Sequence, residues 1–304
     1  MKMAVIDIGT HSVLLLIAQK NSDGNITVLA DEATLTRIGE KMGSMHVFIP
    51  AAMERTLAVL KKYKAICNRH GVEKIIAVGT AAFRKAQNAK DFVEEVKQKT
   101  GIAIEIISGE REAALTWKAA STDFGSDIMV IDIGGGSTEI IMGPRTGDHG
   151  PWTKSLGVGS VLLTEKYGQD YDKLCEVIEN ELQVFPSPLE GEGGRRPGEG
   201  ALVATAGTAT TLGAIKKKMK VYHHNEIHGS KLSLDELKNI IADLRSKTIE
   251  ERKKIPGLEP GRADVILAGS LLLLKTAEHF GFKEITVSDR GVRWGLLYEA
   301  LKIH

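Results

Sequence analysis

Cysteine is scarce in this sequence, which has only Cys67 and Cys175 among 304 residues. The two lie far apart in segments with helical patterns. The sequence therefore predicts two separate thiols, and neither a disulfide framework nor a cysteine-rich metal site. Such cysteine usage is typical of a reducing compartment, so we expect a cytoplasmic location.

Long apolar runs and an excess of one charge are also lacking. The longest apolar run, Val265–Leu274, is too short to span a bilayer, and the N-terminus enters a strand pattern with no signal-peptide core. Lys and Arg number 40 against 39 Asp and Glu, so no overall field attracts nucleic acid or an anionic membrane. We expect neither as a partner, and a polyanionic ligand requires a local site.

The length exceeds what one hydrophobic core usually serves, which favours two domains. An internal repeat supports this prediction. Residues 3–18 and 129–142 each contain two β-rich apolar runs joined by a short Gly/Ser turn, as in a hairpin. Three residues of the first hairpin recur 125 residues later: Asp7, Gly9 and Ser12 correspond to Asp132, Gly134 and Ser137. Residues 75–81 and 201–209 form a second pair of strands that end in Gly-Thr-Ala.

Amphipathic helical patterns alternate with these strands, which indicates an α/β fold. We place a first domain at residues 1–119 and a second at 120–304, with a helix at about 291–304 that can pack back on the first domain. Residues 186–200 hold three prolines and five glycines without periodicity. They are expected to form a flexible surface insertion.

The repeated turn suits phosphate binding. Glycines let backbone N–H groups approach an anion, hydroxyls add donors, and the preceding carboxylate can hold Mg²⁺. One such turn is a weak signal, but two at matched spacing predict loops that clamp a polyphosphate between two domains. The predicted phosphate-binding residues are Gly9, Thr10, His11 and Ser12 in the first loop, and Gly134, Gly135, Gly136, Ser137 and Thr138 in the second.

Seven segments in order resemble the motifs of one family: VIDIGTHSVLLLI, VGTAAFRKAQN, EIISGEREA, VIDIGGGSTEII, ATAGTATTLGA, PGLEPGRADVILAG and VSDRGVRWGLL. They resemble the exopolyphosphatase and guanosine pentaphosphate phosphohydrolase (Ppx/GppA) family. The resemblance covers residues 3–298 and is to short members that lack a C-terminal helical domain. It implies two ribonuclease-H-like domains, as in actin and acetate kinase, around a phosphate-binding cleft.

The resemblance also implies catalytic residues. Glu112 matches the family's catalytic glutamate, whose expected role is the general base that activates the attacking water. Glu110 is the alternative, because only one residue separates the two. Arg84 matches an arginine that points into the cleft, and a guanidinium group suits phosphate oxygens.

Further site residues follow from the same motifs. Asp132 and Glu139 match carboxylates around the second loop and are assigned to Mg²⁺, with help from Asp7 and with Mn²⁺ as an alternative ion. Gly207 and Thr208, in the segment ATAGTATTLGA, are assigned to phosphate binding.

The implied activity is release of terminal phosphate from inorganic polyphosphate, from guanosine pentaphosphate, or from both. Two alternatives remain open, a phosphotransferase of the same superfamily and a sensor that binds without turnover. A homodimer is compatible with the resemblance.

Two residues depart from the family pattern: His11 replaces an asparagine in the first loop, and Trp294 replaces a glutamate between Arg293 and Gly295. We expect Trp294 to change the packing of a terminal helix.

Overall fold

The structure is a computed structural model, and it describes residues 1–42, 46–143, 151–185 and 199–303. Contacts divide the chain into two compact units. The first comprises Met1–Ala119 together with the chain from Val292 onward, and the second comprises Ala120–Gly291. The chain therefore passes between the units within one helix, α4 (Gly109–Phe124), and again directly before α12 (Val292–Ala300).

The first unit is built on a sheet with the strand order β3-β2-β1-β4-β5. Its strands are β1 (Lys2–Ile8), β2 (Ser12–Lys20), β3 (Ile26–Leu35), β4 (Lys74–Gly79) and β5 (Ile104–Ile106). The strands β1, β2 and β3 pair antiparallel, whereas β1, β4 and β5 run parallel. The other helices of this unit are α1 (Pro50–Arg69), α2 (Ala81–Lys85) and α3 (Ala89–Thr100).

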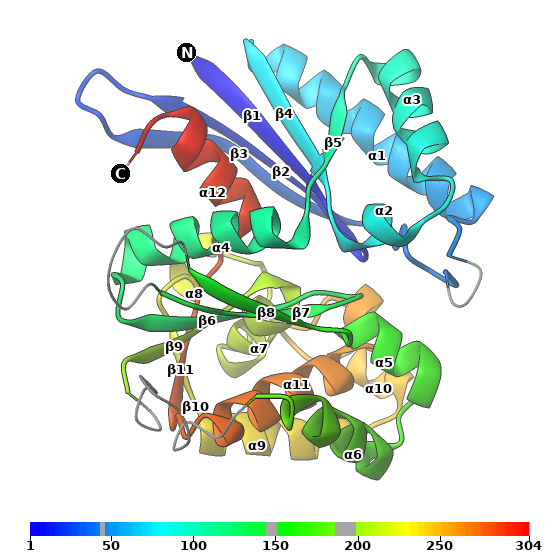
Figure 1. The fold of residues 1–304 in the computed structure, drawn as a ribbon, viewed down its shortest axis with the longest axis vertical. Coiled ribbons are helices and arrows are strands. Elements are labelled where there is room, and N and C mark those ends of the chain that lie inside the picture. The colour runs from blue at the N-terminus through cyan, green and yellow to red at the C-terminus, as the bar shows by residue number, and fades with distance from the viewer. Residues whose placement is uncertain (43–45, 144–150, 186–198, 304) are drawn as a thin grey trace. The chain divides into compact units, whose positions relative to one another are not determined.

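Strand β1 has apolar side chains on both faces, so both faces of this sheet must be covered. Ala4, Ile6 and Ile8 pack with the helices α1, α2 and α3. Met3 and Val5 pack with α4 and α12. Figure 1 shows α1 and α3 on one side of this sheet and α12 on the other. The C-terminal helix thus completes the core of the unit that begins the chain.

The second unit has a sheet with the strand order β10-β11-β9-β6-β7-β8. Its strands are β6 (Ile128–Ile133), β7 (Thr138–Met142), β8 (Trp152–Leu156), β9 (Ala201–Thr205), β10 (Lys231–Ser233) and β11 (Glu284–Val287). Its helices are α5 (Ser160–Tyr167), α6 (Tyr171–Leu182), α7 (Ala206–Lys216), α8 (His224–Ile227), α9 (Leu234–Arg245), α10 (Ile249–Arg252) and α11 (Ile266–His279).

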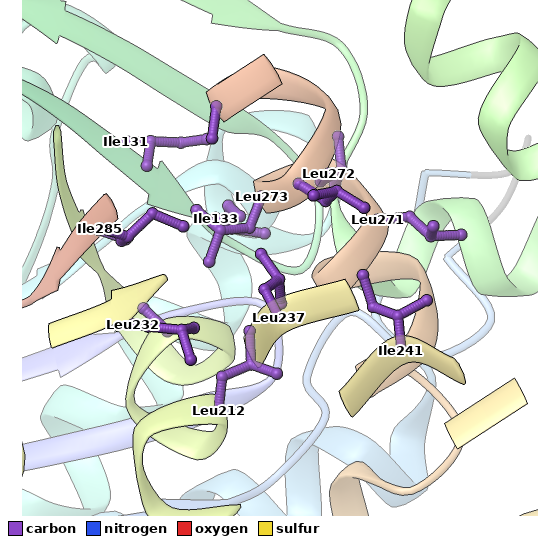
Figure 2. Close-up of a cluster of buried hydrophobic side chains, with 14 of the residues drawn as sticks. Ile131, Ile133, Leu212, Leu232, Leu237, Ile241, Leu271, Leu272, Leu273 and Ile285 are labelled. Atoms are coloured by element: carbon purple, nitrogen blue, oxygen red, sulfur yellow. The ribbon is translucent and has the colours of Figure 1, made fainter. Parts of the chain in front are cut away.

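One large apolar core lies between this sheet and its helices. Figure 2 shows labelled side chains from β6, β10, β11, α7, α9 and α11 meeting in a single cluster. The central helix α11 contains most of the apolar run Val265–Leu274. It is apolar on nearly every side, as expected of a helix that is buried all round. Among the described residues, no helix combines the length and apolarity needed to cross a membrane.

The two sheets repeat one plan, as the sequence predicted. Strands β1 to β5 correspond in order and direction to β6, β7, β8, β9 and β11. The hairpin registers agree to the residue, since Asp7 pairs with Leu14 and Asp132 pairs with Glu139. The predicted α/β fold with two related sheets is confirmed.

The second predicted repeat is displaced by one residue. Val78 of β4 pairs with Asp7, and Thr205 of β9 pairs with Asp132. Gly79 therefore corresponds to Ala206, although both segments contain Gly-Thr-Ala. The match of letters was misleading because Gly79 ends a strand, whereas Gly207 lies in the first turn of α7.

Two minor predictions concern local features. Cys67 and Cys175 form no disulfide. The predicted insertion at residues 186–200 lies outside the described residues except for Glu199 and Gly200, which are exposed.

Candidate active site

The first predicted phosphate loop, Gly9–Ser12, is the turn between β1 and β2. The N–H of its first residue donates to the carbonyl of its last at 2.9 Å. The carbonyl of Thr10 accepts from Gly39 N–H at 3.0 Å, and the carbonyl of His11 accepts from Arg37 N–H at 2.9 Å. In a trans peptide the C=O and the following N–H point in opposite directions, and no described peptide is cis. The N–H groups of His11 and Ser12 thus face away from the segment that fixes the loop.

The second loop, Gly134–Ser137, has the same construction with another support. Its first N–H donates to its last carbonyl at 3.0 Å. The carbonyl of Gly134 accepts from Ser160 N–H, and that of Gly135 accepts from Val161 N–H, each at 3.0 Å. These donors form the first turn of α5, so the N–H groups of Gly135 and Gly136 point away from that helix. Successive N–H groups turned to one side are a recurrent anion-binding arrangement.

Gly159 is a residue of this loop's support that the sequence did not reveal. It precedes α5, and a Cβ built on it would lie 2.6 Å from the carbonyl carbon and oxygen of Gly135 and from the Ser137 nitrogen. By sequence alone, Gly157 and Gly159 indicate no more than a turn. The turn is present between β8 and α5, but Gly159 has the further role of letting two backbone segments touch.

Thr138 differs from its predicted role. Its side chain is fully buried, and its hydroxyl donates to the Val158 carbonyl at 2.8 Å. The hydroxyl therefore fastens the loop to the chain before α5 instead of facing a ligand. The prediction placed it among the phosphate donors because a threonine after Gly-Gly-Gly-Ser continues the loop in sequence, but the strand β7 has already begun there.

The carboxylates expected to hold metal lie at the ends of the two hairpins. In the first unit, Asp7 Oδ1 is buried and has no hydrogen-bond partner. In the second unit, Asp132 and Glu139 are directly opposite each other on β6 and β7, so their side chains share one face. Ser155 donates to Glu139 Oε1 at 2.9 Å. Both sets offer the hard oxygen atoms that Mg²⁺ prefers.

Burial raises the pKa of Asp7 from 3.8 to about 7, with a further increase from the charge of Glu112 and a decrease from Arg293. The folded chain thus binds more protons than the unfolded chain between these two values, and stability is lost as the pH rises through that window. We expect Asp7→Asn to raise the melting temperature at pH 8 in EDTA by several degrees. This rise corresponds to a gain of up to about 4 kcal/mol in the free energy of unfolding. At pH 4 the gain should be absent. Equal melting temperatures of variant and wild type at pH 8 would contradict this assignment.

Glu112 and Arg84 form a largely buried ion pair in the first unit. Glu112 lies in the first turn of α4, and Arg84 lies in α2. Arg84 Nη1 donates to Glu112 Oε2 at 2.6 Å and to the Ile107 carbonyl at 3.1 Å. Only 13% of the Glu112 side chain is exposed. Burial raises the pKa of Glu112, and Arg84 and a hydrogen bond from Thr80 lower it.

Glu110 has a different environment, although it is only two residues away. It is exposed, and hydrogen bonds from its own backbone and from Ser108 lower its pKa. A carboxylate with a lowered pKa in water is a poor proton acceptor. The geometry therefore favours Glu112 over Glu110 as a base, because Glu112 is the one that is desolvated and held by a guanidinium group.

The third predicted phosphate segment, at Gly207 and Thr208, lies at the start of α7. Two close approaches define it. A Cβ on Gly207 would collide with the guanidinium group of Arg262, and a Cβ on Gly269 would lie 2.5 Å from Thr208 Oγ1. Arg262 was not predicted as a site residue. Its signal in the sequence was a Pro-Gly-Arg turn ahead of an apolar helix, in a motif quoted for the family resemblance.

A model of the Ppx/GppA phosphatase family matches residues 16–304. The chain belongs to this family. A Fusobacterium nucleatum protein named bifunctional 3-dehydroquinate synthase/phosphatase is 34% identical over 313 residues, which cover 98% of this chain and 46% of that protein. Exopolyphosphatase 2 of Mycobacterium tuberculosis is 30% identical over 312 residues and 97% of both chains. The solved structure of the Aquifex aeolicus PPX-GPPA enzyme has a TM-score of 0.79 at 33% identity, covering 98% of this chain and 99% of that one.

The two departures from the Ppx/GppA pattern are both buried in this structure. His11 is 7% exposed. Trp294 of α12 is also 7% exposed, and its ring centroid lies 5.6 Å from that of Tyr298. Its neighbour Gly295 touches the Leu115 carbonyl so closely that a Cβ would collide with it. The tryptophan thus fills the core where α12 crosses α4.

Arg293, the residue before Trp294, is a further buried charge that the motif comparison did not assign. Its Nη1 lies 3.0 Å from Asp31 Oδ1, and both side chains are less than a tenth exposed. This pair joins α12 to the edge strand β3, which pairs with β2 of the first loop's hairpin.

Proposed function

We propose that this chain hydrolyses terminal phosphoanhydride bonds, releasing orthophosphate from inorganic polyphosphate, from the 5′ end of guanosine pentaphosphate, or from both. The observation that carries the proposal is the largely buried Glu112 carboxylate paired with Arg84, in a chain whose two hairpin turns have the same backbone construction. The names of the relatives, which include a phosphatase and an exopolyphosphatase, support the same reaction class.

In this proposal each residue has a chemical role. Glu112 accepts the proton of the water that attacks the terminal phosphorus, and Arg84 keeps Glu112 ionised and donates to phosphate oxygens. The N–H groups of His11 and Ser12 and those of Gly135 and Gly136 donate to non-bridging oxygens, where negative charge builds during phosphoryl transfer.

Asp7 would hold Mg²⁺ in the first unit, and Asp132 and Glu139 would hold it in the second. The unpartnered, buried Oδ1 of Asp7 fits such a role, because an oxygen kept from water and from donors is costly unless a cation completes it. When bound, Mg²⁺ or Mn²⁺ neutralises charge on the phosphoryl oxygens.

Two other functions stay possible outcomes of the test. A phosphotransferase would need an acceptor for the phosphoryl group, and a sensor would bind without releasing phosphate. The unpaired cysteines fit the proposed cytoplasmic setting.

The purified chain should be assayed with Mg²⁺ for phosphate release from medium and long polyphosphate and from guanosine pentaphosphate, side by side. Release from none of them would reject the proposal.

A pH profile tests the pairing of Glu112 with Arg84. The guanidinium group lowers the pKa of the Glu112 carboxyl, which burial raises. In Arg84→Met only the Thr80 hydrogen bond should still oppose burial, so the pKa of Glu112 should rise. The acid limb of kcat/KM should move to higher pH as well as the rate falling. Arg111→Met is the matched control. Arg111 lies beside Glu112 in α4, but its side chain is exposed and pairs with Glu299. An unmoved acid limb in Arg84→Met would contradict the pairing.

A further inference from the structure

Arg252, at the end of α10, is a buried cation with an unusual set of partners. It is 2% exposed. Its Nε donates to the Leu244 carbonyl at 2.7 Å, and its Nη1 donates to the Ala263 carbonyl at 3.4 Å and to the Gln169 side-chain oxygen. Among the described residues no carboxylate forms an ion pair with it, and burial lowers its pKa. A desolvated charge without a counter-ion is costly, so neutral acceptors must be held around it.

Gln169 extends this network by one bond. Its Oε1 accepts from Arg252, and its Nε2 donates to the Asp264 carbonyl at 2.8 Å. The amide can satisfy both bonds only in this orientation, since its oxygen accepts and its nitrogen donates. The carbonyls of Ala263 and Asp264 are therefore held by two side chains that are hydrogen-bonded to each other.

These two carbonyls directly follow Arg262, the residue whose guanidinium group lies against Gly207. Farther along, Gly269 of α11 touches Thr208. The segment 262–269 thus backs the third phosphate segment at two points. A change in the path of the chain at Ala263 and Asp264 would move Arg262 relative to Gly207.

We propose that Arg252 and Gln169 are positioning residues that fix Arg262 against the phosphate segment at Gly207 and Thr208. The inference rests on the proposed function, because the inference takes Arg262 and the segment at Gly207 and Thr208 to bind phosphate groups of the substrate. Neither Arg252 nor Gln169 touches the ligand. The hydrogen bonds from Arg252 and Gln169 to backbone carbonyls would keep the chain next to Arg262 rigid. This rigidity matters because small displacements of a charged donor weaken its bond to an anion.

A double-mutant cycle tests this. The ligand is inorganic tripolyphosphate, titrated calorimetrically with all variants carried in Glu112→Gln so that it is not consumed. Gln169→Leu and Arg262→Ala should each weaken binding by about tenfold. If Gln169 acts through Arg262, the double variant should bind no more weakly than Arg262→Ala alone. Independent, multiplying losses would overturn the inference, as would unchanged affinity in Gln169→Leu.

Further variants separate positioning from stability. Gln169→Glu keeps an acceptor for Arg252 and supplies a counter-charge, but it cannot donate to Asp264. It should melt above Gln169→Leu and still bind tripolyphosphate as weakly, whereas recovered affinity would overturn the inference. Ser233→Ala removes the capping box of α9, so it should lower the melting temperature without changing affinity. A parent that binds no tripolyphosphate would reject the proposed function itself; a binding parent with an unaffected Gln169→Leu rejects only the positioning.

Discussion

Glu112→Gln is expected to lower phosphate release by about 10² to 10⁴ while tripolyphosphate affinity stays within several-fold of wild type. The amide keeps the shape of the side chain and can still accept a hydrogen bond from Arg84, but it cannot take a proton from water. Steady-state phosphate release and calorimetric binding, measured on the same preparation, separate the two effects. Binding and turnover should therefore respond differently to one atom.

Glu110→Gln is the matched control for this substitution. Glu110 belongs to the same helix turn, but it is exposed and its pKa is lowered by hydrogen bonds at the start of α4. It should retain nearly full turnover. Near-normal turnover in Glu112→Gln, with loss in Glu110→Gln, would reverse the assignment.

Gly159→Ala is expected to reduce phosphate release by at least about 100-fold, although it adds one methyl group outside both loops. The φ of Gly159 is −142°, which any residue adopts, so the backbone itself permits alanine. The obstacle is steric. The new Cβ would lie 2.6 Å from three backbone atoms of the second loop, and backbone cannot turn aside as a flexible side chain can. The loop must shift, and the N–H groups of Gly135 and Gly136 must shift with it.

Gly157→Ala provides the control within the same turn. A Cβ at Gly157 meets nothing within 4 Å, so this variant should keep wild-type activity and stability. Equal activity of Gly159→Ala and Gly157→Ala would show that the contact with Gly135 does not fix the loop.

The sequence was sufficient to predict the repeated hairpins, and the reason is physical. A tight turn between two buried strands requires glycine, and a strand pattern of two residues per period fixes which carboxylate reaches the turn. The spacing of 125 residues therefore predicted two related sheets, and the observed registers at Asp7 and Asp132 agree.

Other features depend on segments that meet only after folding. Gly159 is 24 residues from Gly135, and Arg262 is 55 residues from Gly207, so no local pattern indicates either contact. The displaced Gly-Thr-Ala match shows the converse error, since equal letters at Gly79 and Gly207 occupy different positions relative to their strands. Thr138 likewise has a residue type that suits phosphate, but its hydroxyl is used by Val158.

Isotope transfer from water tests the central claim most directly. The chain should be incubated with Mg²⁺ and polyphosphate, or guanosine pentaphosphate, in water enriched in ¹⁸O, and the products examined by mass spectrometry. Attack of a Glu112-activated water on the terminal phosphorus predicts one ¹⁸O atom in each released orthophosphate and none in the shortened substrate. Label in the shortened substrate, or phosphate transferred to an added acceptor without labelled orthophosphate, would contradict the account.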